Sequence, residues 1–188
     1  NYYADFASHL LLELEVEACH VMGAGLGALP ALHFTGKQAA LHGIRVRGLV
    51  ADSFTCDLDP RTLHRWLDVR EHYYVRNAKG LHEEHGEDWR EVLEADTDFL
   101  RRLGHRGGYQ VHEALLNAIS CPVMLTGNFM DTRIPDIGRE FARLSRLIPD
   151  CSMYLASKSG HRYAEEHPLM WTDPGTFRAV CDVFFSKI

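Results

Sequence analysis

The chain has 188 residues, 46% of them hydrophobic, and a formal net charge of −6 at pH 7. This length and apolar content fit one globular domain with a single core of ordinary size. Acidic and basic residues are interleaved along the chain, which argues against nucleic acid or an anionic membrane as the main partner and favours a small-molecule substrate or ligand.

The cysteines are spaced singly and lack the CxxC pattern of zinc and redox sites; they are Cys19, Cys56, Cys121, Cys151 and Cys181. We therefore expect reduced thiols and a cytoplasmic protein, with no metal and no cofactor. No segment reaches the roughly 18 apolar residues of a membrane span, and no signal peptide opens the chain, so we expect no membrane partner.

The first predicted element is a helix over Asn1–Glu17, where Tyr3, Phe6, Leu10 and Leu14 recur at helical spacing. Because the sequence opens directly on this helix and not on methionine, we expect a further segment upstream of it.

A strand, a turn and a helix follow. The strand is predicted over Ala18–Met22, the glycine-rich turn over residues 23–27 and the helix over about Ala28–Ala40. The next strand is predicted over Val46–Ala51. Strand, helix and strand in this order predict a parallel pair with a right-handed crossover.

Residues 58–118 differ in character, with many Trp, Tyr, His and charged residues at helical spacing, interrupted by Gly104, Gly107 and Gly108. We interpret this stretch as a helical cap insertion. It divides an α/β core into two parts, residues 1–57 and residues 119–188.

Alternation of strands and helices then resumes, with a strand over Pro122–Thr126, a helix over Ile137–Leu147, a strand over Ser152–Ala156 and a helix over Pro174–Ser186. The predicted fold is therefore α/β, with four parallel strands covered by helices. A parallel sheet of four strands leaves an edge open, so we expect another chain or an upstream segment to complete it.

The turn after the first strand carries the clearest motif. Cys19–Ala28 has the form of the nucleophile elbow, G-x-S-x-G on a sharp strand-to-helix turn, and it resembles that elbow in the α/β-hydrolase family. The family's usual text is G-H-S-x-G-G, and here Ala24 replaces His, Gly25 replaces Ser and Ala28 replaces the last Gly. The resemblance implies that Gly25 holds the nucleophile position and that the N–H of Leu26 contributes to an oxyanion hole.

Gly25 has no nucleophilic atom, so acyl-enzyme chemistry cannot occur at this position as written. Two explanations remain open, an engineered Ser-to-Gly change and a natural loss of catalysis in a binding scaffold. The same segment also fits the dinucleotide fingerprint G-x-G-x-x-A, which requires an acidic residue about 20 positions further on. Asp52 ends the next strand but lies 25 residues beyond Gly27.

The resemblance extends to a triad acid. Asp131 follows the strand Cys121–Thr126 and precedes Pro135, as the acid does in the α/β-hydrolase family. Three residues separate Gly127 from Asp131, whereas the family usually has two, so we expect a small bulge or a shifted turn. The structural alternative is an aspartate that caps a helix at this loop.

Two histidines compete for the position of the triad base. Ser159-Gly160-His161 resembles the family's Gly-His pair, and the distance from Pro149 favours His161. His167 also resembles the family's text, and its distance to Phe177 matches the usual one. We choose His161 and place the six additional residues after it.

Elbow, acid and base occur in the family's order, and the resemblance covers essentially the whole chain. It implies a hydrolase for a small carboxyl ester or lactone, with a Ser-His-Asp triad in the parent protein. The alternatives are a non-catalytic hydrolase-fold protein that binds a ligand or partner, and a dinucleotide-binding α/β domain. The family also carries strands before the elbow and a loop that donates half of the oxyanion hole.

The insertion offers further candidates. Residues 82–85 read His-Glu-Glu-His, but the histidine spacing of the zinc motif H-E-x-x-H is not met, so we expect a solvated helix face. In this family the insertion commonly covers the active site. The aromatic residues that we expect to contact substrate, unless they pack the insertion's own core, are Trp66, Tyr73, Tyr74 and Trp89.

Overall fold

The structure is a computed structural model that describes residues 2–134, 136–157 and 167–188 of the chain. Two compact units make up the chain: Asn1–Thr55 with Val111–Ile188, and Cys56–Gln110. Residues 111–118, which we assigned to the insertion, lie in the first unit.

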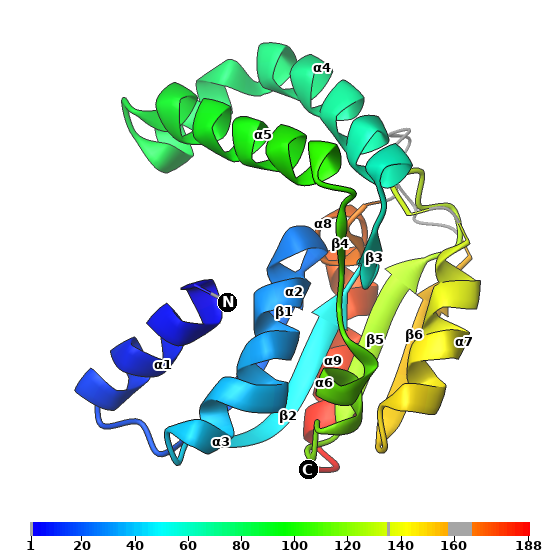
Figure 1. Cartoon of the computed structure of the whole chain (residues 1–188). Helices are drawn as coiled ribbons and strands as arrows, with labels where there is room; N and C mark the ends of the chain where they lie inside the picture. Colours follow the sequence, from blue (N-terminus) through cyan, green and yellow to red (C-terminus); the bar gives the residue numbers. More distant parts are fainter. Residues whose placement is uncertain (1, 135, 158–166) are drawn as a thin grey trace. The chain divides into compact units, whose positions relative to one another are not determined.

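The first unit contains a parallel sheet (Figure 1). Its described strands are β1 (Ala18–Ala24), β2 (Arg45–Asp52), β5 (Val123–Asn128) and β6 (Cys151–Ala156), in the spatial order β1-β2-β5-β6. The prediction of four parallel strands is confirmed. Since all strands point the same way, their carboxyl ends share one edge of the sheet, where α/β folds place their ligands.

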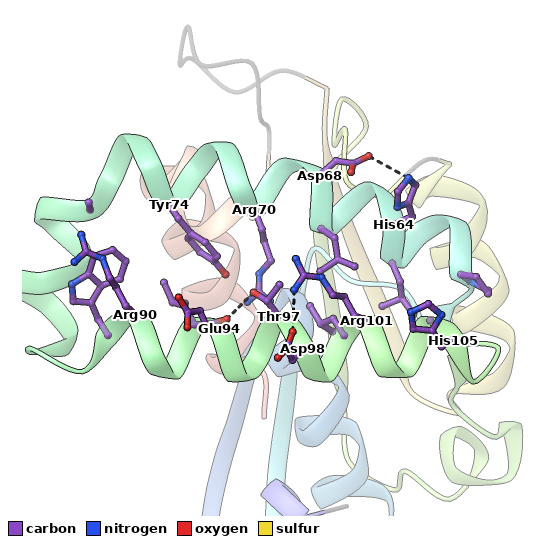
Figure 2. A pocket seen from close by; sticks show the side chains of 18 residues that line it. His64, Asp68, Arg70, Tyr74, Arg90, Glu94, Thr97, Asp98, Arg101 and His105 are labelled. Carbon is purple, nitrogen blue, oxygen red and sulfur yellow. Dashed lines mark hydrogen bonds and ion pairs between the residues drawn. The ribbon is translucent and has the colours of Figure 1, made fainter.

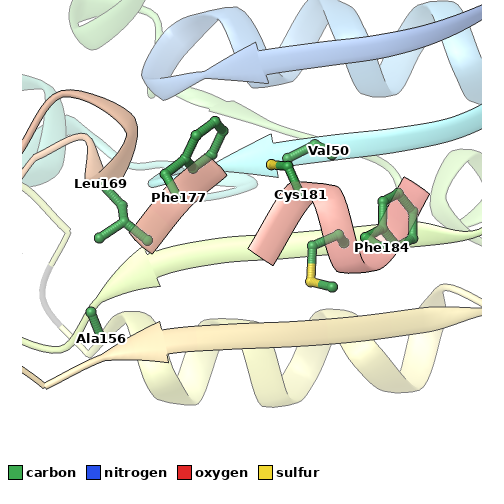
Figure 3. Close-up of a cluster of buried hydrophobic side chains, with 7 residues drawn as sticks. Val50, Ala156, Leu169, Phe177, Cys181 and Phe184 are labelled. Carbon is green, nitrogen blue, oxygen red and sulfur yellow. The ribbon is translucent and has the colours of Figure 1, made fainter. Parts of the chain in front are cut away.

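One face of the sheet is covered by α9 (Pro174–Phe185), preceded by the short helix α8 (Leu169–Thr172). Figure 3 shows the cluster that joins this face to the strands. Phe177 and Phe184 of α9 pack with Val50 of β2 and Met124 of β5 in this cluster. Strand residues on this face alternate with those that face the other side, as the two-residue period of a strand requires.

The other face is covered by α2 (Ala28–His33), α6 (Glu113–Asn117) and α7 (Ile137–Leu147) (Figure 1). The helix α7 has the bounds that its apolar spacing predicted. Its residues Ile137, Phe141 and Leu144 are buried at intervals of four and three. A side chain at Gly127 of β5 would meet Ile137, so glycine there lets α7 pack closely on the sheet.

Two predicted helices differ from the structure. The helix predicted over Ala28–Ala40 is interrupted by a π-helical turn, Phe34–Gln38, before the short helix α3 (Ala39–Leu41). Gly36 lies inside this turn, and a Cβ there would be 2.7 Å from the carbonyl oxygen of Leu115. The first helix, α1 (Tyr2–Glu13), ends before the predicted Glu17.

The second unit is mainly helical. It consists of a short antiparallel pair, β3 (Asp57–Leu58) with β4 (Tyr109–Gln110), and two long helices, α4 (Pro60–His85) and α5 (Trp89–His105), that pack against each other. The described part of the chain contains no helix with the length and apolar character needed to cross a bilayer.

Candidate functional site

Gly23 and Gly25 shape the turn after β1. A Cβ on Gly23 would overlap the backbone carbonyl oxygen of Gly27, so this close approach needs glycine at position 23. Gly25 has a φ of +54°, in the left-handed region that side chains rarely adopt. The chain therefore reverses sharply between β1 and α2, with position 25 at the apex of the turn.

Position 25 faces the ring of His167. A Cβ built on Gly25 would lie 3.3 Å from Nε2 and 3.8 Å from Cε1 of His167. Gly25 itself is buried. A side chain at this position would therefore point directly at the outer nitrogen of the imidazole.

Asp131 follows β5 on a turn built by Asn128. The Oδ1 atom of Asn128 accepts a hydrogen bond of 2.8 Å from the N–H of Met130, and its carbonyl accepts one of 3.1 Å from the N–H of Asp131. We expected a bulge or shifted turn at this place, and β5 continues to Asn128 before the chain turns. The two residues that precede the acid, Phe129 and Met130, are both 59% exposed.

The carboxylate of Asp131 has contacts on both oxygens. Its Oδ1 atom accepts hydrogen bonds from the N–H groups of Arg133, at 2.9 Å, and Ile134, at 3.1 Å. Its Oδ2 atom lies 2.8 Å from Nδ1 of His167. Arg133 and Ile134 lie in a turn before α7, whose N-cap is Asp136, so Asp131 does not cap that helix as the structural alternative supposed. Its carboxylate holds the turn with one oxygen and pairs with a histidine through the other.

The Asp131–His167 pair is almost completely buried. The side chain of Asp131 is 0% exposed and that of His167 is 7% exposed. Because a carboxylate accepts hydrogen bonds, the proton of a neutral imidazole is on Nδ1, and Nε2 keeps its lone pair on the side facing Gly25. This arrangement can accept a proton from a group at position 25.

His161, our first choice for the base, lies outside the described residues. The histidine that the structure brings to Asp131 and Gly25 is the alternative, His167. It precedes Pro168 through a cis peptide bond, immediately before α8. Leu26, whose N–H we expect to serve an oxyanion, follows Gly25 in the turn and is half-buried.

A second buried carboxylate, Asp52, lies at the same edge of the sheet, at the end of β2. It is 0% exposed and pairs in register with Ala24 of β1 and Thr126 of β5. Its oxygens accept hydrogen bonds from the Thr126 hydroxyl at 2.8 Å, the Ser53 hydroxyl at 3.1 Å and the Met170 N–H at 3.0 Å.

Burial raises the pKa of Asp52, although its hydrogen bonds and the charge of His167 act in the opposite direction. From the sequence alone, this residue is a candidate only for the acidic position of a dinucleotide fingerprint. An acidic residue at the carboxyl end of an apolar strand was the available signal. Its contact with Met170 could not be predicted from the sequence, because the two residues are 118 positions apart.

The second unit contains a cavity of about 1070 Å³ between α4 and α5 (Figure 2). Tyr74 and Trp89, two of the aromatic residues that we singled out, contribute to its lining. Trp66 is buried but does not line the cavity, and the side chain of Tyr73 lies outside what the structure describes. The aromatic candidates therefore divide between cavity lining and packing.

Several charged side chains at this cavity have partners of opposite charge within the second unit. Arg70 pairs with Asp96, and Nη1 of Arg101 lies 2.9 Å from Oδ1 of Asp98. The labelled side chains in Figure 2 accordingly mix both signs. The cavity lining therefore carries charges of both signs, some of them paired with each other or with a neighbouring side chain.

Within the described residues, no group of three or more His, Cys, Asp or Glu side chains is arranged so that it could hold a metal ion. In particular His82 and His85, in the last turn of α4, are both exposed.

No protein-family model and no curated protein sequence matches the chain. Solved structures do match. Proline iminopeptidase from Mycobacterium smegmatis aligns over 98% of this chain and 70% of its own, with 17% identity and a TM-score of 0.61.

Two other solved structures give the same result. MGS-M2, an α/β-hydrolase enzyme from a Medee basin deep-sea metagenome library, aligns over 97% of this chain and 70% of its own, with 18% identity and a TM-score of 0.66. The esterase RhEst1 from Rhodococcus sp. ECU1013 aligns over 98% and 71%, with 18% identity and a TM-score of 0.60.

These likenesses establish the class of the protein: the chain has the α/β-hydrolase fold, as its sequence motifs predicted. It corresponds to about seven-tenths of the length of the structures named above. At such low identity the likeness concerns the fold, and the chemistry must be argued from the site itself.

Proposed function

We propose that Gly25, Asp131 and His167 mark the catalytic centre of a hydrolase for small carboxyl esters or lactones, in which Gly25 holds the position of the nucleophile. The observation that carries this proposal is the alignment of three groups. The Oδ2 atom of Asp131 lies 2.8 Å from Nδ1 of His167, and Nε2 of the same ring faces the Cβ direction of position 25 at 3.3 Å.

With serine at position 25, this geometry supports acyl transfer. His167 would accept the hydroxyl proton on Nε2 as the oxygen attacks the substrate carbonyl, while Asp131 holds the ring and stabilises its cation. The N–H of Leu26 would donate to the oxyanion of the tetrahedral intermediate. His167 would then protonate the leaving alcohol, and a water molecule would release the acyl group by the same steps.

Glycine at position 25 supplies neither oxygen nor sulfur, so the acyl-enzyme cannot form in the chain as it stands. The second candidate function is therefore binding of a small ligand at the same edge of the sheet without turnover. The φ of +54° at Gly25 favours this binding function, because glycine adopts that backbone conformation without strain whereas serine would be strained there. A natural gene that encodes serine at this position would exclude it.

The dinucleotide-binding alternative receives less support. Its acidic residue would hydrogen-bond a ribose hydroxyl, but the carboxylate of Asp52 is 0% exposed and accepts three hydrogen bonds from the protein. Asp131 and His167 have no role in that alternative.

The proposal is tested in the full-length protein, which includes the expected upstream segment, with Gly25→Ser and the matched control Gly25→Ala. Both substitutions add a Cβ at the left-handed position, and only serine adds a hydroxyl. We expect Gly25→Ser to hydrolyse a short-chain aryl ester with turnover and Gly25→Ala to remain at background. Adding His167→Ala to the serine variant should abolish the gain. Equal, background rates for the folded serine and alanine variants would reject a triad at this site.

A further inference from the structure

The segment that carries His167 is held by contacts beyond its pair with Asp131. Directly after His167 and Pro168, the backbone N–H of Leu169 donates to the Ser53 hydroxyl at 3.0 Å. The next N–H, of Met170, donates to Oδ2 of Asp52 at 3.0 Å. Two consecutive backbone donors are thus bound by two consecutive side chains at the end of β2.

These two side chains are themselves fixed. The Ser53 hydroxyl donates to Oδ1 of Asp52 at 3.1 Å, and the Thr126 hydroxyl donates to the same oxygen at 2.8 Å. The backbone N–H of Ser53 donates to the carbonyl of Thr126 at 2.7 Å. Asp52 and Ser53 are both 0% exposed, so these hydrogen bonds lie away from solvent.

Ser53 adopts a φ of +50°, which is uncommon for a residue with a side chain. This region is unfavourable for a residue with a side chain, and such a residue persists there where the surrounding structure determines its conformation. In this backbone conformation, the Ser53 hydroxyl donates a hydrogen bond to Asp52 and accepts one from the N–H of Leu169. Strain of this kind commonly marks a functional position.

Apolar packing holds the same segment from the other side. Leu169 is 0% exposed and belongs to the cluster that contains Ala156 and Phe177 (Figure 3). Two kinds of contact therefore fix the backbone just after His167, while Asp131 fixes its ring. A base must be held within a fraction of an ångström to transfer a proton efficiently.

We propose that Asp52 and Ser53 are positioning residues, which hold the backbone after His167 so that its ring meets Asp131 with one nitrogen and position 25 with the other. The inference rests on the proposed function, in which His167 is the base. The orientation of the ring, however, can be measured without a substrate and without a nucleophile.

The experiment compares the tautomer of the His167 ring in the unaltered protein and in Asp52→Ala. It records nitrogen–proton correlation spectra of samples labelled with ¹⁵N-histidine. The signals of His167 are assigned by their absence from the spectrum of His167→Ala. We expect a single tautomer with the proton on Nδ1 in the unaltered protein. In Asp52→Ala we expect a mixture of tautomers, because the ring loses its fixed orientation. Ser53→Ala should shift the tautomer in the same direction by a smaller amount.

Two controls separate positioning from stability. Asp52→Asn keeps an oxygen for the Met170 N–H and should preserve most of the Nδ1 tautomer. Leu144→Ala removes a fully buried side chain of α7, and we expect it to lower the free energy of unfolding while leaving the tautomer unchanged. An unchanged tautomer in folded Asp52→Ala, or a mixture already in the unaltered protein, would overturn the proposal.

Activity gives a second readout in the Gly25→Ser background. We expect Asp52→Ala to lower kcat by about 10- to 100-fold with little change in KM, because a misplaced base affects the chemical step more than binding. If Gly25→Ser shows no turnover while Asp52→Ala still mixes the tautomers, the proposed function fails and the positioning role stands. If Gly25→Ser is active and Asp52→Ala changes neither tautomer nor kcat, the positioning role fails alone.

Discussion

The carboxylate of Asp131 meets the imidazole of His167 at 2.8 Å although the two residues are 36 positions apart in the chain. Asp131 stands on the turn after β5, and His167 stands just before α8, which lies against β5. The shared edge of the parallel sheet brings both of them to the turn at Gly25. Under the proposed function, this meeting of distant segments forms the proton-transfer site.

The first prediction concerns the acid. In the Gly25→Ser background, Asp131→Asn should lower kcat on the order of 10⁴-fold, because an amide can hold the wrong tautomer of His167. The fold should survive, since the amide oxygen can still accept from the N–H groups of Arg133 and Ile134. Ester hydrolysis and circular dichroism measure the two effects. A kcat within tenfold of the parent would contradict the assignment.

The second prediction concerns the backbone of the turn. Gly25→Ala should lower the free energy of unfolding by about 1 kcal/mol or more, because the φ of +54° disfavours any side chain. Gly27→Ala is the matched control: its φ is −66° and a Cβ there has no contact within 4 Å. Urea denaturation should find the control unchanged or slightly more stable. Equal destabilisation by both would argue against the described turn.

The third prediction follows from the close approach of Gly23 and Gly27. Gly23→Ala should destabilise more than Gly25→Ala, since its Cβ would overlap backbone atoms that cannot move independently of α2. The midpoint of urea denaturation compares the two variants directly. A Gly23→Ala protein as stable as the parent would show that the turn has another shape.

The fourth prediction concerns the thiols. Burial raises the pKa of Cys121, Cys151 and Cys181 to about 11 each. The reactive thiolate is therefore scarce at pH 8, and iodoacetamide should label these residues much more slowly than a free thiol. Because the pKa of these thiols is higher in the folded protein than in the unfolded chain, the free energy of unfolding should fall as the pH rises from about 9 towards 11. Labelling at pH 8 as fast as after unfolding would contradict the burial.

The fifth prediction concerns the N-terminus of α4. The carboxylate of Asp59 accepts a hydrogen bond of 2.8 Å from the N–H of Thr62, so Asp59→Ala should lower the free energy of unfolding of the second unit by about 1 kcal/mol. Asp88→Ala is the control, because Asp88 precedes α5 without such a bond. Hydrogen exchange of the α4 amides reports the difference. Equal effects of both changes would count against the cap.

Much of the fold could be predicted because local patterns and packing agree. Ile137, Phe141 and Leu144 repeat on one face, and α7 forms over the predicted residues. The π-helical turn at Phe34–Gln38 could not be predicted in this way, since it accompanies the contact of Gly36 with Leu115, far along the chain. Helical spacing likewise does not reveal that α6 packs in the first unit.

The site shows the same limit. Gly25, Asp131 and two candidate histidines were found from motifs, because each motif is local in sequence. The contacts of Asp52 and Ser53 with the segment after His167 join residues more than 100 positions apart. Pairings of this length depend on the folded sheet, and no local pattern in a single sequence records them.

The shape of the turn after β1 has a genetic consequence. The close approach of Gly23 to the backbone of Gly27 constrains the path of the chain, whereas a side chain at position 25 would face His167. Some serine and glycine codons differ by a single base. Under the proposed function, a point mutation would be enough to convert an enzyme into a ligand-binding protein, or to reverse that change, while the scaffold stays intact.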